Sequence, residues 1–315
     1  MPESAVRTFS DPDDYAASIT GGTVQLTAVG CGDFHAKLTR IYLQRLLLQR
    51  CSEHLPRILE AVGIRGRDYI LFRTQPGPIL LQSSIEISPS SILRFGRYPE
   101  FYQRSSGPAS FASMSVPIED IASVGEVMAG RDLTLPNNPL LTTPPPAAMD
   151  RLQRLHAAAG QLAENAPEII ANQHAARGLE QALIEAMVGV LGHREDSHSN
   201  VARGQHDIVM RRFRRVVEES PDQQLYITDI CKTLRVSIRT LQVCCREHLG
   251  MGPKHYLVLR RMHLAQRALR QADPDATTVT DIATRYGFWQ LGRFAIEYHS
   301  LFGEIPSATL QRQFA

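Results

Sequence analysis

The sequence has few of the residues that disulfide frameworks, zinc sites and membrane spans require. Its five cysteines are an odd number and include no Cys-x-x-Cys pair, so we expect reduced thiols rather than disulfides or a zinc site. The longest apolar stretches, 182–191 and 46–48, are too short to span a bilayer, and the acidic N-terminus lacks the basic and apolar segments of a signal peptide. We therefore expect a cytoplasmic protein that does not enter a membrane.

Residue patterns of enzymes are equally scarce. His35 has no His-x-His partner, His193 and His198 fall in a polar stretch, and no glycine-rich phosphate loop precedes a lysine. No nucleophile with an accompanying base is visible in the sequence. We therefore expect no enzyme, with no catalytic residue, no metal ligand and no cofactor.

Charge is balanced overall but not along the chain. The formal net charge is +2, yet residues 207–315 hold 16 Lys and Arg against 11 Asp and Glu, whereas residues 1–206 hold 18 against 21. A basic C-terminal third is compatible with the neutralisation of phosphates, although a solvated helical surface has the same composition.

The first 117 residues contain β-favouring runs separated by Gly and Pro. The spacing of these turn residues is that of a small antiparallel barrel or sandwich. The expected strands lie within Thr23–Val29, Ala36–Leu48, Tyr69–Thr74, Ile79–Ile87, Ile92–Phe95 and Ser110–Val116.

Helical spacing follows this region. A helix is expected after Pro117, and two series of leucines on either side of Pro167 predict a helical hairpin. The polar stretch from His193 through Gly204 predicts a flexible linker. These boundaries divide an α+β chain into a sensory or dimerisation β-barrel domain (1–140), a helical hairpin (141–193), a linker (194–206) and an all-α domain (207–315).

One pattern occurs twice in the all-α domain. Each copy has a Thr-Asp-Ile start, an apolar position in a second helix and a Gly-x-x-Pro stop, and the offset is 52 residues at the start and 53 thereafter. A capped helix, a tight turn and a second helix with a polar outer face make a helix-turn-helix unit, so two copies predict a bipartite DNA reader. The matched positions are Thr228–Ile230, Leu241, Gly250 and Pro253, and then Thr280–Ile282, Phe294, Gly303 and Pro306.

The second helix of the first copy carries candidates for reading bases. Arg239, Gln242 and Arg246 fall on one face at i, i+3 and i+7, whereas Leu241 and Cys245 fall on the opposite face and should be buried. Arg and Gln form bidentate hydrogen bonds with guanine and adenine in the major groove. Arg239 and Gln242 are therefore predicted base contacts.

The second copy offers a similar face. Its second helix is expected to present Gln290 and Arg293 outward, as base contacts, and to bury Leu291, Phe294 and Tyr298.

Predicted phosphate contacts combine hydroxyls at helix starts with cations. Thr228 and Ser237 are expected to cap the two helices of the first copy. A solvated position is an equally good interpretation of Arg246. The predicted phosphate contacts are Thr228, Ser237, Arg246, Lys254 and Thr280.

A single helix is expected between the two copies, from Pro253 to Arg270, with a length of about 25 Å at 1.5 Å per residue. Such a spacer places two recognition helices in successive major-groove faces, about 34 Å apart, without a protein dimer. Its expected buried stripe is Tyr256, Leu259, Met262, His263, Ala265 and Leu269.

Other side chains near the two turns leave alternatives open. Trp289 either packs over the turn, which we favour, or touches a thymine methyl group, and Glu297 either is solvated or accepts from a cytosine amine. Cys244 and Cys245 are either a redox or alkyl-accepting pair or buried thiols, and burial is the expectation for Cys245.

Residues 207–313 resemble the AraC/XylS family of bacterial transcription regulators. The resemblance is carried by Asp281-Ile282-Ala283, Tyr286-Gly287-Phe288, Arg293-Phe294, Tyr298 and Phe302-Gly303-Glu304-x-Pro306-Ser307, in the order and spacing of the family signature, and the stretch from Gly287 to Ala295 is similar to EutR-type members. The first 200 residues resemble the family's cupin-like sensory barrel much more weakly.

The sequence departs from the family pattern on both second helices. Val243 and Cys245 stand where the family often has Arg and Phe, and Ile296 stands where several relatives carry Arg. Base reading by the first copy is therefore expected to be altered, and Arg293 to matter more in the second.

The resemblance implies a sequence-specific regulator that binds double-stranded DNA and activates transcription by contacting RNA polymerase. We expect an unidentified small-molecule effector and a possible homodimer through the N-terminal region. The alternative is a sensory or scaffold protein whose helix-turn-helix units bind protein partners.

Overall fold

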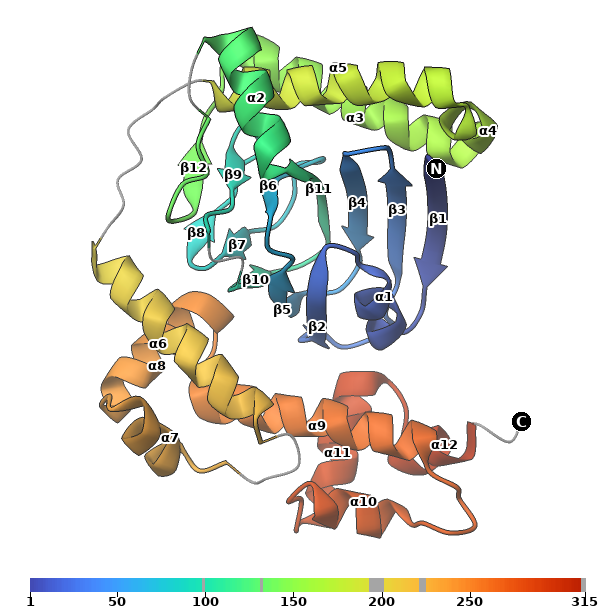
Figure 1. Cartoon of the computed structure of the whole chain (residues 1–315). Coiled ribbons are helices and arrows are strands. Elements are labelled where there is room, and N and C mark those ends of the chain that lie inside the picture. The colour runs from blue at the N-terminus through green and yellow to red at the C-terminus, as the bar shows by residue number, and fades with distance from the viewer. Residues whose placement is uncertain (98–99, 131–132, 193–200, 221–224, 313–315) are drawn as a thin grey trace.

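The computed structural model describes residues 1–97, 100–130, 133–192, 201–220 and 225–312. A sheet-rich N-terminal domain is covered on one side by helices, and a helical C-terminal domain lies on its other side (Figure 1). No helix in these ranges is both long and apolar enough to cross a bilayer.

The N-terminal domain contains two antiparallel sheets rather than one closed ring of strands, as far as the described residues show. The larger sheet has seven strands in the order β1-β3-β4-β11-β6-β9-β12. Its strands are β1 (Glu3–Phe9), β3 (Ala36–Tyr42), β4 (Leu47–Glu53), β6 (Arg67–Arg73), β9 (Ile92–Arg94), β11 (Ala109–Pro117) and β12 (Leu140–Thr142).

The smaller sheet has five strands in the order β2-β5-β10-β7-β8. A short helix, α1 (Pro12–Ser18), precedes it, and Asp11 caps the start of this helix by accepting from the amides of Asp13 and Asp14. The strands are β2 (Gly22–Ala28), β5 (Arg57–Gly63), β7 (Leu80–Gln82), β8 (Ile85–Glu86) and β10 (Glu100–Ser105).

The predicted strands agree with the structure where apolar and polar residues alternate clearly or β-branched residues form a run. The run Ala36–Leu48 was expected as one element, but it contains all of β3 and the start of β4, joined by a turn. Strands β1, β5 and β10 were not predicted, because their charged and small residues hide the apolar alternation that defines a strand.

Two apolar layers hold the domain together. Leu38, Cys51, Leu71 and Phe111 belong to the core between the two sheets. The opposite face of the larger sheet packs on helices, which together bury a second core that includes Ile41. The covering helices are α2 (Ile118–Ala129), α3 (Pro146–Asn165), α4 (Pro167–Ala171) and α5 (Gln173–Leu191).

The C-terminal domain is all helical. Helix α6 (Val201–Glu218) includes residues 201–206, which the sequence assigns to the linker, while residues 193–200 of that predicted linker, with His193 and His198, lie outside the described residues. The remaining helices are α7 (Ile227–Leu234), α8 (Ile238–Leu249), α9 (Pro253–Gln271), α10 (Val279–Arg285), α11 (Leu291–Phe302) and α12 (Pro306–Gln311).

Glu180 of α5 ties the helical layer to the larger sheet. Its carboxylate is buried and accepts hydrogen bonds from the backbone amides of Arg45 and Leu46, in the turn between β3 and β4. Glu185, one turn later on the same helix, instead forms a solvated ion pair with Arg151.

We expect Glu180→Ala to lower the free energy of unfolding by about 2–3 kcal/mol, because it leaves two backbone donors of the turn without an acceptor. Glu185→Ala is the matched control and should cost less than about 1 kcal/mol, since its ion pair is solvated. Urea unfolding of both variants measures the difference. Equal losses would show that Glu180 does not anchor the turn.

Candidate nucleic-acid interface

The first helix pair, α7 and α8, is joined by a tight turn. Helix α7 ends at Arg235, whose φ of 55° is left-handed, and Ser237 caps α8 by accepting from the Thr240 amide at 3.0 Å. The predicted cap at Ser237 is thus confirmed. The predicted cap at Thr228 is wrong, because α7 begins at Ile227, and Tyr226 at its N-cap makes no side-chain hydrogen bond.

Helix α8 separates a polar face from a buried one, as predicted. Arg239, Gln242 and Arg246 are exposed, whereas Leu241 and Cys245 have no exposed surface. The buried residues share a core with Met210 and Phe213 of α6 and Tyr256 of α9.

The two adjacent thiols of α8 both belong to this core. Cys244 and Cys245 are completely buried, and burial raises the pKa of Cys244 to about 11. Burial also raises the pKa of Cys245. Both thiols are therefore protonated near neutral pH and unfavourable as nucleophiles.

Helix α8 ends at Gly250, in a left-handed conformation that favours glycine. Its φ is 73°, and a Cβ atom there would collide with the guanidinium of Arg104 from β10. The end of α8 is thus placed directly against the N-terminal domain.

The second helix pair, α10 and α11, repeats this geometry with different capping. Thr278 and Asp281 form a capping box at the start of α10, so Thr280, one residue into the helix, lies exposed and does not cap. Gly287, with φ of 77°, lies in the turn, and Gly303, with φ of 74°, ends α11.

The face of α11 differs in part from the prediction. Gln290 and Arg293 are exposed and Phe294 and Tyr298 are buried, as expected, but Leu291 is 39% exposed rather than buried. Leu291 is the first residue of the helix, where no neighbouring helix covers that side.

The side chains of Glu297 and Trp289 also contribute to the surface around α11. Arg293 donates from Nε to Glu297 at 2.7 Å, so Glu297 has a partner within the helix. Trp289 is 74% exposed, so the expected packing over the turn is wrong.

Helix α9 connects the two pairs through 19 residues, a length of about 28 Å at 1.5 Å per residue. The whole predicted stripe is buried, from Tyr256 to Leu269. Lys254, Thr228 and Ser237 are exposed, so every predicted base or phosphate contact lies on the surface of the C-terminal domain.

The contact between the domains was not predicted from sequence. On the outer face of β5, the buried carboxylate of Glu60 accepts a hydrogen bond from the hydroxyl of Tyr256 and lies 3.6 Å from Arg214 of α6. Arg214 also donates to the carbonyl of Ala61 at 2.9 Å. The polar groups of Tyr256 and His263 in a mostly apolar stripe were the available signal, but the partner of Tyr256 lies 196 residues away.

A second contact joins α9 to the end of β2 and to the start of α1. Nε2 of His263 donates to the carbonyl of Ala28 at 2.9 Å, and Arg267 and Arg270 pair with Asp13 and Asp11. Burial lowers the pKa of His263 to about 4, so the ring is neutral at physiological pH.

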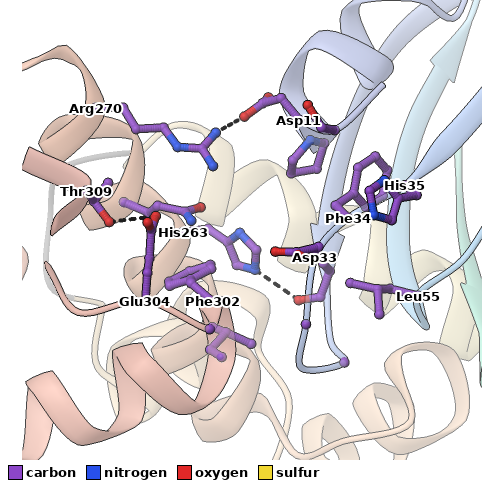
Figure 2. Close-up of a pocket in the computed structure, with 18 of the residues that line it drawn as sticks. Asp11, Asp33, Phe34, His35, Leu55, His263, Arg270, Phe302, Glu304 and Thr309 are labelled. Atoms are coloured by element: carbon purple, nitrogen blue, oxygen red, sulfur yellow. Dashed lines mark hydrogen bonds and ion pairs between the residues drawn. The ribbon is translucent and has the colours of Figure 1, made fainter. Parts of the chain in front are cut away.

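Figure 2 shows the cavity beside this second contact. It measures about 680 Å³ and has both acidic and basic side chains on its walls. Asp11, Asp33 and His35 come from the N-terminal domain, and Arg270 and Glu304 from the C-terminal domain.

A smaller cavity of about 80 Å³ lies inside the N-terminal domain, between its sheets. Leu59 and Ala61 of β5 and Phe101 and Gln103 of β10 contribute to its lining. Most of the lining of this cavity is apolar.

A buried ionic group borders the small cavity. Nε of Arg57 donates to Glu53 at 2.7 Å, and the hydroxyl of Tyr15 donates to the same carboxylate at 2.9 Å. The Arg57 guanidinium also donates to Gln103, which lines the cavity. This pairing is what permits two full charges to lie in the interior.

Comparison with known proteins gives a family match for the C-terminal domain. Residues 230–312 match a family model described as a helix-turn-helix domain. Over 95 residues, this chain is 40% identical to the probable thc operon regulatory protein of Rhodococcus erythropolis, covering 30% of this chain and 29% of that protein. It is also 34% identical over 118 residues to the XylDLEGF operon transcriptional activator 3 of Pseudomonas putida, covering 36% of each.

Residues 230–312 therefore form a helix-turn-helix domain that is similar to the C-terminal region of an operon activator. The match spans only about a third of the length of these curated relatives. Among solved structures, the AraC-like transcriptional activator CuxR is similar with a TM-score of 0.44 and 15% identity, over 84% of this chain and 95% of that one. The helix-turn-helix model and the XylDLEGF activator, rather than the structural neighbour, confirm the resemblance of this domain to AraC/XylS regulators.

The Glu60 contact gives the domain interface a definite pH dependence. Burial raises the pKa of this carboxyl above its ordinary value of 4.5. A raised pKa stabilises the folded state below the unfolded pKa, and this contribution is lost as pH rises through the folded pKa. We therefore expect the stability of the wild type relative to Glu60→Gln to fall as pH rises from 4.5 towards neutrality.

Urea unfolding of both full-length proteins at several pH values measures this difference. His263 is present in both proteins, so its contribution to the pH dependence of stability cancels in the comparison. A difference that stays constant with pH would mean that Glu60 remains ionised in the interface.

Proposed function

We propose that this protein is a sequence-specific DNA-binding transcription regulator, an activator that responds to a small-molecule effector. The observation that carries the proposal is the exposed ridge of Arg239, Gln242 and Arg246 on α8, within a domain similar to regulators of operons. Such side chains form bidentate contacts with base edges and neutralise phosphates. The named relatives are regulators rather than enzymes.

The two helix pairs act as two helix-turn-helix units in this proposal. Helices α8 and α11 enter the major groove, and α9 sets the distance between them. The base contacts are Arg239, Gln242, Gln290 and Arg293, and the phosphate contacts are Thr228, Ser237, Arg246, Lys254 and Thr280.

The N-terminal domain acts as a cupin-like sensory domain. Its two sheets enclose the small apolar cavity, which supports binding of an effector there, and the larger cavity between the domains offers a second place. The proposed units are the sensory domain 1–140, the hairpin 141–193 and the reader 207–315, and the predicted linker 194–206 is shortened because α6 already begins at Val201.

In this proposal, effector binding changes DNA binding by shifting the population between two arrangements of the domains. Strand β5 points Leu59 and Ala61 towards the small cavity, whereas Ile58 and Glu60 on its other face contact the C-terminal domain. One strand therefore touches both the proposed effector and the reader. An effector that shifts this strand changes which arrangement of the two units is favoured, provided that it binds the two arrangements with different affinities.

The proposal also includes partners outside the chain. RNA polymerase is the expected target of activation, a homodimer through the N-terminal region is the expected assembly, and the cytoplasm is the expected location. A scaffold that uses the helix pairs to bind proteins is the competing function. DNA binding that hardly changes with salt would favour the scaffold, because phosphate neutralisation is strongly salt-dependent.

We expect Arg293→Ala to cost about 1–3 kcal/mol of specific binding and to relax one base position, since a bidentate contact is lost. Sites selected from a random duplex pool by each protein measure this change. Lys232→Ala is the control, because this exposed lysine on α7 pairs only with Asp229 among the described residues and has no predicted DNA contact. An unchanged preference in Arg293→Ala would remove Arg293 from the base contacts.

Lys254→Ala should weaken binding to all sequences alike, because a phosphate contact carries no sequence information. The slope of log affinity against log salt should fall by about 1. Titrations of one duplex at several salt concentrations measure the slope. A loss confined to one sequence would instead assign Lys254 to base reading.

A further inference from the structure

Helices α8 and α11 expose aliphatic side chains at equivalent positions. Val243 of α8 and Ile296 of α11 are related by the offset of 53 residues that relates Gly250 to Gly303. Val243 is 38% exposed and Ile296 is 72% exposed. The same position therefore carries an exposed apolar residue in both helix pairs, which makes it a repeated feature of this surface.

Both side chains lie opposite the core of their helix. Val243 is two residues from the buried Leu241 and Cys245, and Ile296 is two residues from the buried Phe294 and Tyr298. Because residues two apart in a helix point to nearly opposite sides, each aliphatic residue occupies the middle of the exposed face.

More apolar surface lies at the N-terminal end of each helix. Ile238 is 47% exposed and Leu291 is 39% exposed, and these two residues are again related by the offset of 53. Trp289, just before α11, is 74% exposed. The start of each of these helices therefore adds exposed apolar surface to that of Val243 and Ile296.

The charges around these residues indicate what the surface contacts. On α8, Val243 has Arg239 one turn before it and Arg246 nearly one turn after it, both exposed. On α11, Arg293 lies on the exposed side, three residues before Ile296. Aliphatic groups among cations suit a polyanion that also presents apolar groups, and the major groove does so through the C5-methyl group of thymine.

We propose that Val243 and Ile296 read thymine methyl groups, one through each helix pair, and so give this protein a preference for A·T pairs at those positions. The inference rests on the proposed function, because it needs α8 and α11 in the major groove. It adds apolar contacts to the polar base contacts proposed for Arg239 and Arg293.

The test replaces thymine by uracil, which lacks only the C5-methyl group. Full-length protein first selects binding sites from a random duplex pool, and the selected duplexes are then made with deoxyuridine in place of thymidine. Loss of one buried methyl should weaken binding roughly fourfold, and loss of both about fifteenfold.

Single variants assign each methyl contact to its side chain. In Ile296→Ala and in Val243→Ala, the penalty for uracil should disappear at one half of the site and remain at the other, which is a double-mutant cycle between protein and base. Ile305→Ala is the matched control, because Ile305 is 52% exposed but lies beyond the end of α11. Thermal unfolding confirms that each variant is folded, as exposed positions predict.

The outcomes separate this inference from the proposed function. Tight, sequence-specific binding that is equal for thymine and uracil duplexes would overturn the methyl contacts and leave the regulator intact. A uracil penalty that persists in both alanine variants would also overturn them. Failure of the wild type to select any DNA would refute the proposed function itself and favour a protein partner for the apolar face.

Discussion

The buried carboxylate of Glu60 is the contact on which the relative placement of the two domains depends. It lies on the outer face of the smaller sheet, and its partners, Tyr256 and Arg214, come from two different helices of the C-terminal domain. A charge can be buried there only because both partners are present. Removing either partner would leave an unpaired polar group in an apolar core that also contains Ile58 and Tyr102. The position of α6 and α9 is therefore coupled to that of β5.

This coupling gives the smaller sheet two roles at once. Alternate residues of a strand point to opposite faces, so β5 and β10 line the small cavity with one set of side chains and contact the C-terminal domain with the other. Because a close-packed interior has low compressibility, strain on one face of the sheet is transmitted to the other. The second contact, through His263 and the Arg270 and Asp11 pair, lies on a different part of α9. The two contacts together hold α9 along much of its length, so the helix pairs at its ends cannot reorient independently of the N-terminal domain in this arrangement.

The two helix pairs share a frame but differ on their surfaces. In both pairs the second helix ends at a glycine with a left-handed φ. Each second helix also buries two residues that are four positions apart, Leu241 and Cys245 in α8 and Phe294 and Tyr298 in α11. The first pair exposes Arg239 and Gln242, whereas the second exposes a larger aliphatic and aromatic surface. A duplicated frame with divergent surfaces suits the reading of two different half-sites, and this expectation follows from the exposed residues rather than from the cores.

The sequence by itself determined the local frame of the C-terminal domain. Residues three to seven positions apart fix a helical face, so the buried stripe of α9, the cap at Ser237 and the polar ridge of α8 could all be predicted. The same periodicity predicted the helical hairpin. It failed for β1, β5 and β10, where charged and small residues interrupt the alternation, and for Leu291 and Trp289, whose exposure depends on which neighbours cover the start of α11. Tertiary structure alone decided the pairing of Glu60 with Tyr256, the division of the strands into two sheets and the cavity between the domains. These features join residues far apart in the chain, and local spacing contains no information about which distant surfaces meet.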